Sequence, residues 1–197
     1  MYKPKEYFIH GLLFFLTLGA ATLSGGEWVY GKSILVSGEA FLSWEFFLKS
    51  LAFSIPFIGI LLIHELGHLF TALYHKVRCS LPYFIPAWLG FLGAPSIGTF
   101  GAIIQMKGFV DSRKKYFDIG VAGPIAGFLV AFGVLCYGFT TLPPAEYIYT
   151  VHPEYADPNF QGYGDEVVEF ELGGNLLFWG MEKVLSLIHI SEPTRPY

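Results

Sequence analysis

One short run of this sequence combines residue types and a spacing that could hold a metal ion. It reads His64-Glu65-Leu66-Gly67-His68. Residues four apart lie on the same face of a helix, so both imidazoles can reach one ion. Zinc lowers the pKa of its bound water toward neutrality, and Glu65 lies where it could take up that proton and return it to a leaving amine. The run therefore predicts a zinc peptidase centre, with His64 and His68 as ligands and Glu65 as catalytic acid and base.

The segment that carries this run is otherwise apolar. Leu51–Tyr74 contains no ionisable groups except the two histidines and the glutamate of the run. As a helix it would be about 36 Å long, enough to cross a hydrocarbon core of about 30 Å. A charged side chain near the centre of a bilayer costs about 3 kcal/mol, so such groups are kept there mainly for function. We therefore favour the metal centre over the alternative, a structural cluster of hydrogen bonds.

A third ligand is not evident beside the motif, although a catalytic zinc site usually has three protein ligands. The metzincin pattern would place Gly and His where this chain has Thr71 and Tyr74. His75 lies one residue beyond the metzincin ligand position, and we favour its interpretation as a histidine at the membrane interface. A thermolysin-like site needs a downstream glutamate, and none occurs between Glu65 and Glu146.

Two aspartates and two histidines remain to be considered as ligands. Asp111 lies between the second and third apolar segments, and Asp118 lies at the start of the third. Asp118 is a weaker candidate, because an aspartate at the start of a helix is explained by the helix dipole. His10 and His152 have no partner pattern, and we expect both to be incidental.

Three apolar segments could cross a membrane: Phe8–Leu23, Leu51–Tyr74 and Tyr116–Thr140, while a fourth begins near Gly174. Hydrophobic residues make up 53% of the chain and charged residues only 14%. The fold class expected is an all-α polytopic membrane protein with about three complete transmembrane helices and the start of a fourth. The lipid bilayer is therefore an expected partner. Nucleic acid is not, since the chain has no basic block or nucleic-acid module.

Residues 79–110 are apolar but rich in Gly and Pro, which form helices poorly. Thr99–Met106 is β-prone and follows Gly98. We expect a short β-strand or hairpin near 98–106 that dips into the membrane. Irregular backbone survives at that depth only when protein or a water-filled cavity covers it. An ordinary interfacial loop is the alternative.

The distribution of charge predicts an orientation. Residues 76–115 hold six Lys or Arg and one acid, whereas 141–173 hold seven acids and no Lys or Arg. Basic connections stay on the cytoplasmic side. We therefore expect the N-terminus, with Lys3 and Lys5, and the 76–115 loop to be cytoplasmic and 141–173 to lie outside. We expect a multi-pass protein located in a bacterial inner membrane.

Several motifs together resemble the site-2 protease family of intramembrane zinc metalloproteases, most of all its bacterial and plastid branch. They are HELGH, then LPYFIPA at 81–87, GTFGAI at 98–103 and AGPIAG at 122–127. The resemblance implies cleavage of transmembrane protein substrates within or near the bilayer. It also implies Zn²⁺ held by His64 and His68, with Glu65 as acid and base. It further suggests a strand edge that binds an unwound substrate, formed by Gly98, Thr99, Phe100, Gly101, Ala102 and Ile103.

The chain departs from this family in one respect. The family takes its third zinc ligand from an Asp on a later core helix, and this chain has no Asp after Asp165. Residues 185–197 resemble a translated sequencing adapter, so we expect a natural sequence cut near Val184. The divisions expected are 1–50, an N-terminal span and external loop; 51–184, a partial metalloprotease core; and 185–197, a non-native tail. We expect this truncated chain to be inactive. The alternative is a non-catalytic membrane protein of the same fold that binds or holds membrane helices.

Overall fold

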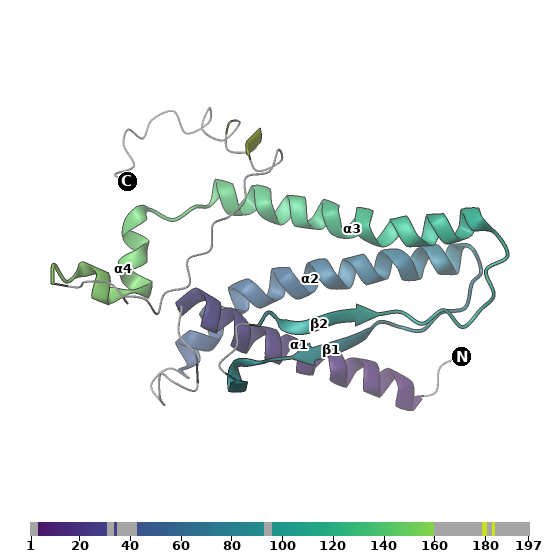
Figure 1. Cartoon of the computed structure of the whole chain (residues 1–197), viewed down its shortest axis with the longest axis horizontal. Helices are drawn as coiled ribbons and strands as arrows, with labels where there is room; N and C mark the ends of the chain where they lie inside the picture. The colour runs from purple at the N-terminus through teal and green to yellow at the C-terminus, as the bar shows by residue number, and fades with distance from the viewer. Residues whose placement is uncertain are drawn as a thin grey trace. The chain divides into compact units, whose positions relative to one another are not determined.

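The computed structural model describes residues 4–30, 34, 43–92, 96–159, 179, 180 and 183. Three long helices and one small sheet make up most of this part of the chain (Figure 1). Short helical turns lie between the strands and after the third long helix. The elements are α1 (Pro4–Tyr30), α2 (Trp44–Tyr74), β1 (Tyr83–Ala87), η2 (Gly90–Leu92), β2 (Gly98–Ile103), α3 (Arg113–Thr140), η3 (Ala145–Tyr147), α4 (Ile148–Val151) and η4 (Pro153–Ala156).

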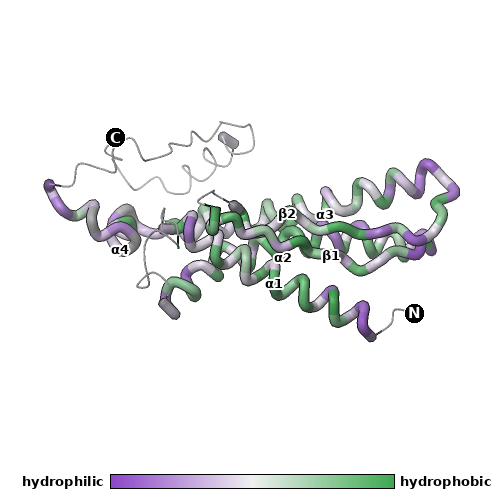
Figure 2. The backbone as a smooth tube through the Cα atoms, turned by 60° about the horizontal axis from the view of Figure 1, so that its bottom comes forward, coloured by the Kyte–Doolittle hydropathy of each residue, from purple (hydrophilic) through white to green (hydrophobic). Residues whose placement is uncertain are grey.

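The three long helices confirm the predicted fold class. They have 27, 31 and 28 residues, and each is long and apolar enough to cross a membrane. Their lengths correspond to about 40–47 Å, which exceeds a hydrocarbon core of about 30 Å. Hydrophobic residues run along these helices, and hydrophilic residues gather at the ends, including the connection before α3 (Figure 2). The fourth apolar stretch predicted near Gly174 begins outside the described residues, and the 185–197 tail lies outside them entirely.

Both ends of α2 are fixed by local hydrogen bonds. The helix begins seven residues before the predicted span, because the Ser43 hydroxyl accepts from the Phe46 N–H at 3.1 Å and caps the first turn. At the other end Val77 N–H donates to the Ala72 carbonyl at 2.8 Å. Lys76 has a left-handed φ of 59°. This is a Schellman ending, and it sets where the helix stops.

The two strands form an antiparallel hairpin. Its β2 strand confirms the strand predicted near 98–106, whereas its partner β1 was not predicted. Gly101 has a φ of 104°, and its N–H donates at 2.9 Å to the Thr99 hydroxyl, which itself donates to the Ile85 carbonyl at 2.8 Å. An isolated bridge between Cys79 and Met106 extends the pairing. The pairs are Tyr83 with Ile103, Phe84 with Ala102, Pro86 with Thr99 and Ala87 with Gly98, with an irregularity between Phe84 and Pro86.

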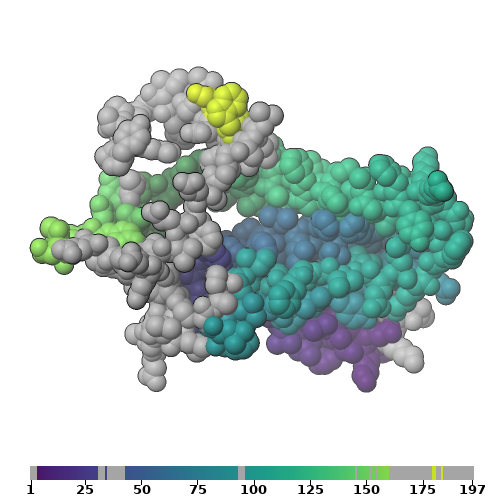
Figure 3. Space-filling view, in the orientation of Figure 1, coloured from purple at the N-terminus to yellow at the C-terminus, as the bar shows by residue number. Residues whose placement is uncertain are grey.

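The hairpin packs against α1 and α2. Ala21, Ile58 and Phe84 are buried together, one from each of α1, α2 and β1. A Cβ added at Gly98 would overlap the α1 backbone at Ala21, so β2 approaches α1 as closely as a glycine allows. In the space-filling view the strands lie over α1 and α2 on the face shown (Figure 3). The hairpin is therefore covered by protein on the side that faces α1 and α2.

The chain divides into two compact units, Met1–Val134 and Leu135–Tyr197. The first contains α1, α2, both strands and most of α3. The second contains the end of α3 and the short helices α4, η3 and η4, whose described side chains are largely exposed. The residues singled out for chemistry all belong to the first unit.

Candidate metal centre

The two histidines of the motif lie together on α2, as their spacing predicted. Their Nε2 atoms face each other at 3.1 Å. Two ligand nitrogens held at 2.0–2.1 Å by one tetrahedral zinc ion would be about 3.3–3.4 Å apart. The separation between His64 and His68 is close to that value, so the pair fits a shared zinc ion.

A backbone carbonyl of α3 fixes which nitrogen of His68 carries the proton. His68 Nδ1 lies 2.7 Å from the Ile119 carbonyl oxygen. A carbonyl only accepts, so Nδ1 carries the proton and donates. In neutral His68 the lone pair is then on Nε2, the atom that faces His64. Metal-binding histidines are commonly oriented in this way by an acceptor on their other nitrogen.

Three glycines allow α3 to lie against the histidine face of α2. A Cβ on Gly67 would come within 2.6 Å of an α3 carbonyl oxygen, and one on Gly123 would overlap the His68 imidazole. A Cβ on Gly127 would lie 3.1 Å from the Cβ of His64. Small residues let helices approach closely in membranes, and here they do so where HELGH of α2 meets AGPIAG of α3.

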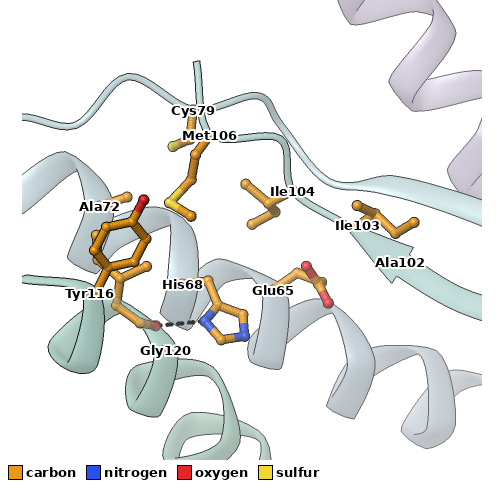
Figure 4. Close-up of a pocket in the computed structure, with 11 residues that line it drawn as sticks. Glu65, His68, Ala72, Cys79, Ala102, Ile103, Ile104, Met106, Tyr116 and Gly120 are labelled. Atoms are coloured by element: carbon orange, nitrogen blue, oxygen red, sulfur yellow. Dashed lines mark hydrogen bonds between the residues drawn. The ribbon is translucent and has the colours of Figure 1, made fainter. Parts of the chain in front are cut away.

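Glu65 is buried, with 6% of its surface exposed, and opens with His68 onto a cavity of about 350 Å³. Both side chains come from α2 and lie below the β2 region (Figure 4). A carboxylate beside an imidazole, within a largely apolar cavity, has the chemistry to accept and donate a proton. The cavity is lined by Glu65, His68, Ala72, Cys79, Ala102, Ile103, Ile104, Met106, Tyr116, Ile119 and Gly120.

The residues predicted to bind substrate divide into two groups. Ala102 and Ile103 line the same cavity as Glu65. Phe100 is 72% exposed. Gly98 and Thr99 are instead buried, since Gly98 packs on α1 and the Thr99 hydroxyl bonds within the hairpin. The C-terminal half of the predicted segment therefore reaches the cavity, whereas its first residues hold the hairpin in place.

The two weaker ligand candidates contact each other. His75 Nε2 donates to Asp118 Oδ2 at 3.0 Å. Asp118 lies in the second turn of α3, which begins at Arg113, so it does not stabilise the helix N-terminus as expected. Sequence reasoning missed this contact, although His75 follows His68 by two helical turns on the same face. Within the described ranges no group of three His, Cys, Asp or Glu could hold a metal ion.

The other titratable groups near this end have local partners or are buried. A hydrogen bond from Lys115, at 2.7 Å, holds the pKa of the Asp111 carboxyl below its usual value. Burial raises the pKa of the Cys79 thiol. His10, expected to be incidental, is buried, and its Nδ1 donates to the Pro82 carbonyl at 3.0 Å, so it ties α1 to the start of β1.

Residues 52–190 match the family model of peptidase family M50. The chain is 31% identical to the probable zinc metalloprotease EGY1, chloroplastic, of Arabidopsis thaliana over 145 residues, 68% of this chain and 25% of that protein. It is 41% identical to the EGY1 protein of Oryza sativa subsp. japonica over 81 residues, 41% of this chain and 13% of that protein. It is 36% identical to the probable zinc metalloprotease EGY2, chloroplastic, of Oryza sativa subsp. indica over 88 residues, 45% of this chain and 15% of that protein.

The matched region contains the histidine pair, both strands and the α3 glycines. The chain spans a quarter or less of the length of these relatives. No solved structure shows significant similarity to it. Because the family model covers more than half of the chain, the chain belongs to peptidase family M50, the site-2 protease family.

Proposed function

We propose that this chain is part of an intramembrane zinc endopeptidase that cleaves transmembrane segments of membrane proteins. The observation that carries the proposal is the histidine pair, whose Nε2 atoms face each other at 3.1 Å. Glu65 lies beside them, inside a helix long and apolar enough to cross a membrane. Membership of peptidase family M50 and relatives named zinc metalloproteases support the same activity.

The residues of the chain have separate tasks in this reaction. His64 and His68 would hold zinc, which supplies a polarised substrate carbonyl and water of lowered pKa when it is bound. Glu65 would take a proton from the attacking water in the cavity and deliver it to the leaving amine. The Ile119 carbonyl keeps the proton of His68 on Nδ1, and thereby leaves Nε2 available as a ligand.

An extended substrate is proposed to lie along β2. A transmembrane helix bonds its own amides internally, so it must unwind before hydrolysis, and a strand edge can pair with the amides that are released. Ala102 and Ile103 of β2 line the cavity that contains Glu65. Their position supports a substrate strand that passes beside the catalytic carboxylate.

The proposed activity needs more ligands than the described residues supply. Catalytic zinc sites usually have three protein ligands, and this part of the chain brings two histidines together. We therefore propose that residues 1–197 alone bind zinc weakly and turn over little or no substrate. Peptidase activity of residues 1–197 at the level of a family member with three ligands would contradict this.

The orientation in the membrane is proposed from charge. The N-terminus and the 76–115 connection, which is rich in Lys and Arg, would face the cytoplasm, and the acidic 141–173 segment the opposite side. The relatives reported above are described as chloroplastic. A bacterial inner membrane therefore stays a prediction.

Zinc binding by residues 1–197 in detergent tests the proposal, with competition against a chromophoric chelator as the measurement. We expect one weakly bound zinc ion, which His64→Ala and His68→Ala both abolish. His152→Ala is the control, since His152 belongs to the second unit of the chain. Unchanged zinc binding in His64→Ala would contradict the assignment of the ligands.

Catalysis is tested separately with a member of peptidase family M50 that carries the counterparts of His64, Glu65 and His68. Glu65→Gln should retain zinc but lose cleavage of a transmembrane substrate. The alternative function, a non-catalytic protein that binds or holds membrane helices, predicts that neither form cleaves the substrate. Equal cleavage by both forms would also refute the catalytic role of Glu65.

A further inference from the structure

A second contact joins α2 to α3 two helical turns from the histidine pair. His75 Nε2 donates to Asp118 Oδ2 at 3.0 Å, and the two side chains are 16% and 32% exposed. Neither residue lines the cavity. Asp118 is nevertheless adjacent in sequence to Ile119, whose carbonyl accepts the hydrogen bond from His68.

The α2 side of this contact is held firmly. His75 is the C-cap residue of α2, and its N–H donates to the Thr71 carbonyl at 3.1 Å. The Schellman ending that follows brings Val77 back onto Ala72, and both belong to one buried cluster. The imidazole of His75 therefore projects from a backbone that is fixed by several hydrogen bonds.

On α3, the residue that follows Asp118 is Ile119, which contacts the proposed ligand His68. Ile119 belongs to the same buried cluster, and its carbonyl is 2.7 Å from His68 Nδ1. Each residue of a helix advances about 1.5 Å along the axis. A slip of α3 by one residue, which shifts the helix by about 1.5 Å and turns it by about 100°, would therefore point the Ile119 carbonyl away from His68 Nδ1 and break this N–H···O bond. The register of α3 on α2 decides which carbonyl meets His68.

We propose that His75 and Asp118 are positioning residues, which hold α3 in the register at which the Ile119 carbonyl keeps the His68 proton on Nδ1. The inference rests on the proposed function, in which His68 Nε2 is a zinc ligand. Asp118 acts through Ile119 and does not itself bind the metal. The ion pair of Asp111 with Lys115 supplies a control, since it is an i,i+4 pair at the start of the same helix and the attraction of Asp111 to His75 is the smallest of the effects on its carboxyl.

The tautomer of His68 gives a test that needs no metal. Residues 1–197 labelled with ¹⁵N-histidine would be studied by NMR in detergent without zinc, with His68→Gln to assign the signals. We expect His68 to be protonated at Nδ1 in the unchanged chain and in Asp111→Ala. In Asp118→Ala we expect a mixture of both tautomers. An unchanged tautomer in Asp118→Ala, or an equal change in Asp111→Ala, would overturn the proposal.

A double variant guards against simple loss of folding. His75→Asp combined with Asp118→His keeps one acid and one imidazole at the contact with their places exchanged. We expect it to restore the Nδ1-protonated form of His68. If it folds and gives the same mixture as Asp118→Ala, the contact does not set the register and the proposal fails.

Zinc affinity separates this inference from the proposed function. Loss of an outer contact of a ligand weakens metal binding about 10–100-fold. We expect the lower end, about tenfold, in Asp118→Ala and no change in Asp111→Ala. An unchanged chain that binds no zinc contradicts the proposed function, while the tautomers still decide the inference. Complete loss of zinc in Asp118→Ala with an unchanged tautomer would make Asp118 a ligand and overturn the positioning role.

Discussion

Replacement of Gly123 by alanine tests whether the close approach of α3 maintains the metal centre. In a helix interior the change from Gly to Ala normally stabilises by about 0.5–1 kcal/mol. At this position the new Cβ would overlap the His68 imidazole. The ring cannot turn away without losing its 2.7 Å hydrogen bond to Ile119. Overpacking of this kind costs about 1–3 kcal/mol, so we expect a net loss of stability between zero and about 2.5 kcal/mol.

Gly133→Ala is the matched control, because it lies on the same helix and an added Cβ there meets no atom within 4 Å. Gly133→Ala should therefore be more stable than the unchanged chain by about 0.5–1 kcal/mol, the full amount that alanine gains over glycine in a helix. The difference between the two variants isolates the overlap, about 1–3 kcal/mol, which corresponds to roughly 2–12 °C in melting temperature for a chain of this size. Thermal unfolding in detergent, followed by tryptophan fluorescence, measures it.

Zinc affinity provides the second measurement on the same two variants. Because the overlap displaces a proposed ligand, Gly123→Ala should bind zinc about 10–100-fold more weakly, a loss typical when the orientation of a ligand is disturbed. Gly133→Ala should bind zinc as the unchanged chain does. Equal melting temperatures together with equal zinc affinities would refute the close packing of α3 on His68.

Three further predictions concern the rest of the first unit. The Thr22 hydroxyl donates to a carbonyl within α1 and lies 2.8 Å from the Ser54 hydroxyl of α2. Thr22→Val leaves Ser54 unpartnered across the interface. In chemical unfolding this variant should therefore lose about 1 kcal/mol more stability than Ser54→Ala. The Cys79 thiol is buried and its pKa is raised, so maleimide should label it slowly at neutral pH and rapidly after denaturation. Lys115→Ala should raise the pKa of Asp111 in a carboxyl NMR titration. Because folding lowers that pKa, the pair stabilises the chain above the ordinary pKa of the carboxyl and loses this contribution as pH falls through the lowered value.

The long helices could be predicted because their signal is local. A run of apolar residues of sufficient length identifies α2 whatever it packs against. Its first seven residues were missed because Lys49 and Ser50 interrupt the hydropathy. The structure continues the helix through them, with a Ser43 cap and a 2.9 Å ion pair between Glu45 and Lys49. The start of α2 is therefore set by local hydrogen bonds and cannot be predicted from hydropathy alone.

The hairpin shows the limit of local patterns. Its β2 strand follows from a β-prone run, whereas β1 contains Pro86 and was not recognised as a strand. Proline lacks an N–H and is tolerated at an edge or an irregularity. In the structure Pro86 flanks the register irregularity of β1 and still pairs with Thr99. That pairing joins segments more than ten residues apart, so neither segment reveals it alone.

At the candidate metal centre, too, some contacts could be predicted from local patterns and others could not. The approach of His64 and His68 follows from their spacing on one helix. The contacts from His68 to Ile119 and from His75 to Asp118 depend on the register between α2 and α3. No periodicity within either helix encodes that register. The sequence therefore predicts the ligands but not the groups that orient them.

The AGPIAG motif acquires a physical meaning from its contact with His68. Pro124 has no N–H, so the Gly120 carbonyl one turn earlier lacks its usual helical donor, and the proline ring also pushes on that carbonyl. The neighbouring Ile119 carbonyl is the one that accepts from His68. Gly123 leaves the space that the imidazole occupies. Gly123 of the motif thus provides the space, and Ile119 just before the motif provides the acceptor, that the His68 side chain needs in an apolar environment.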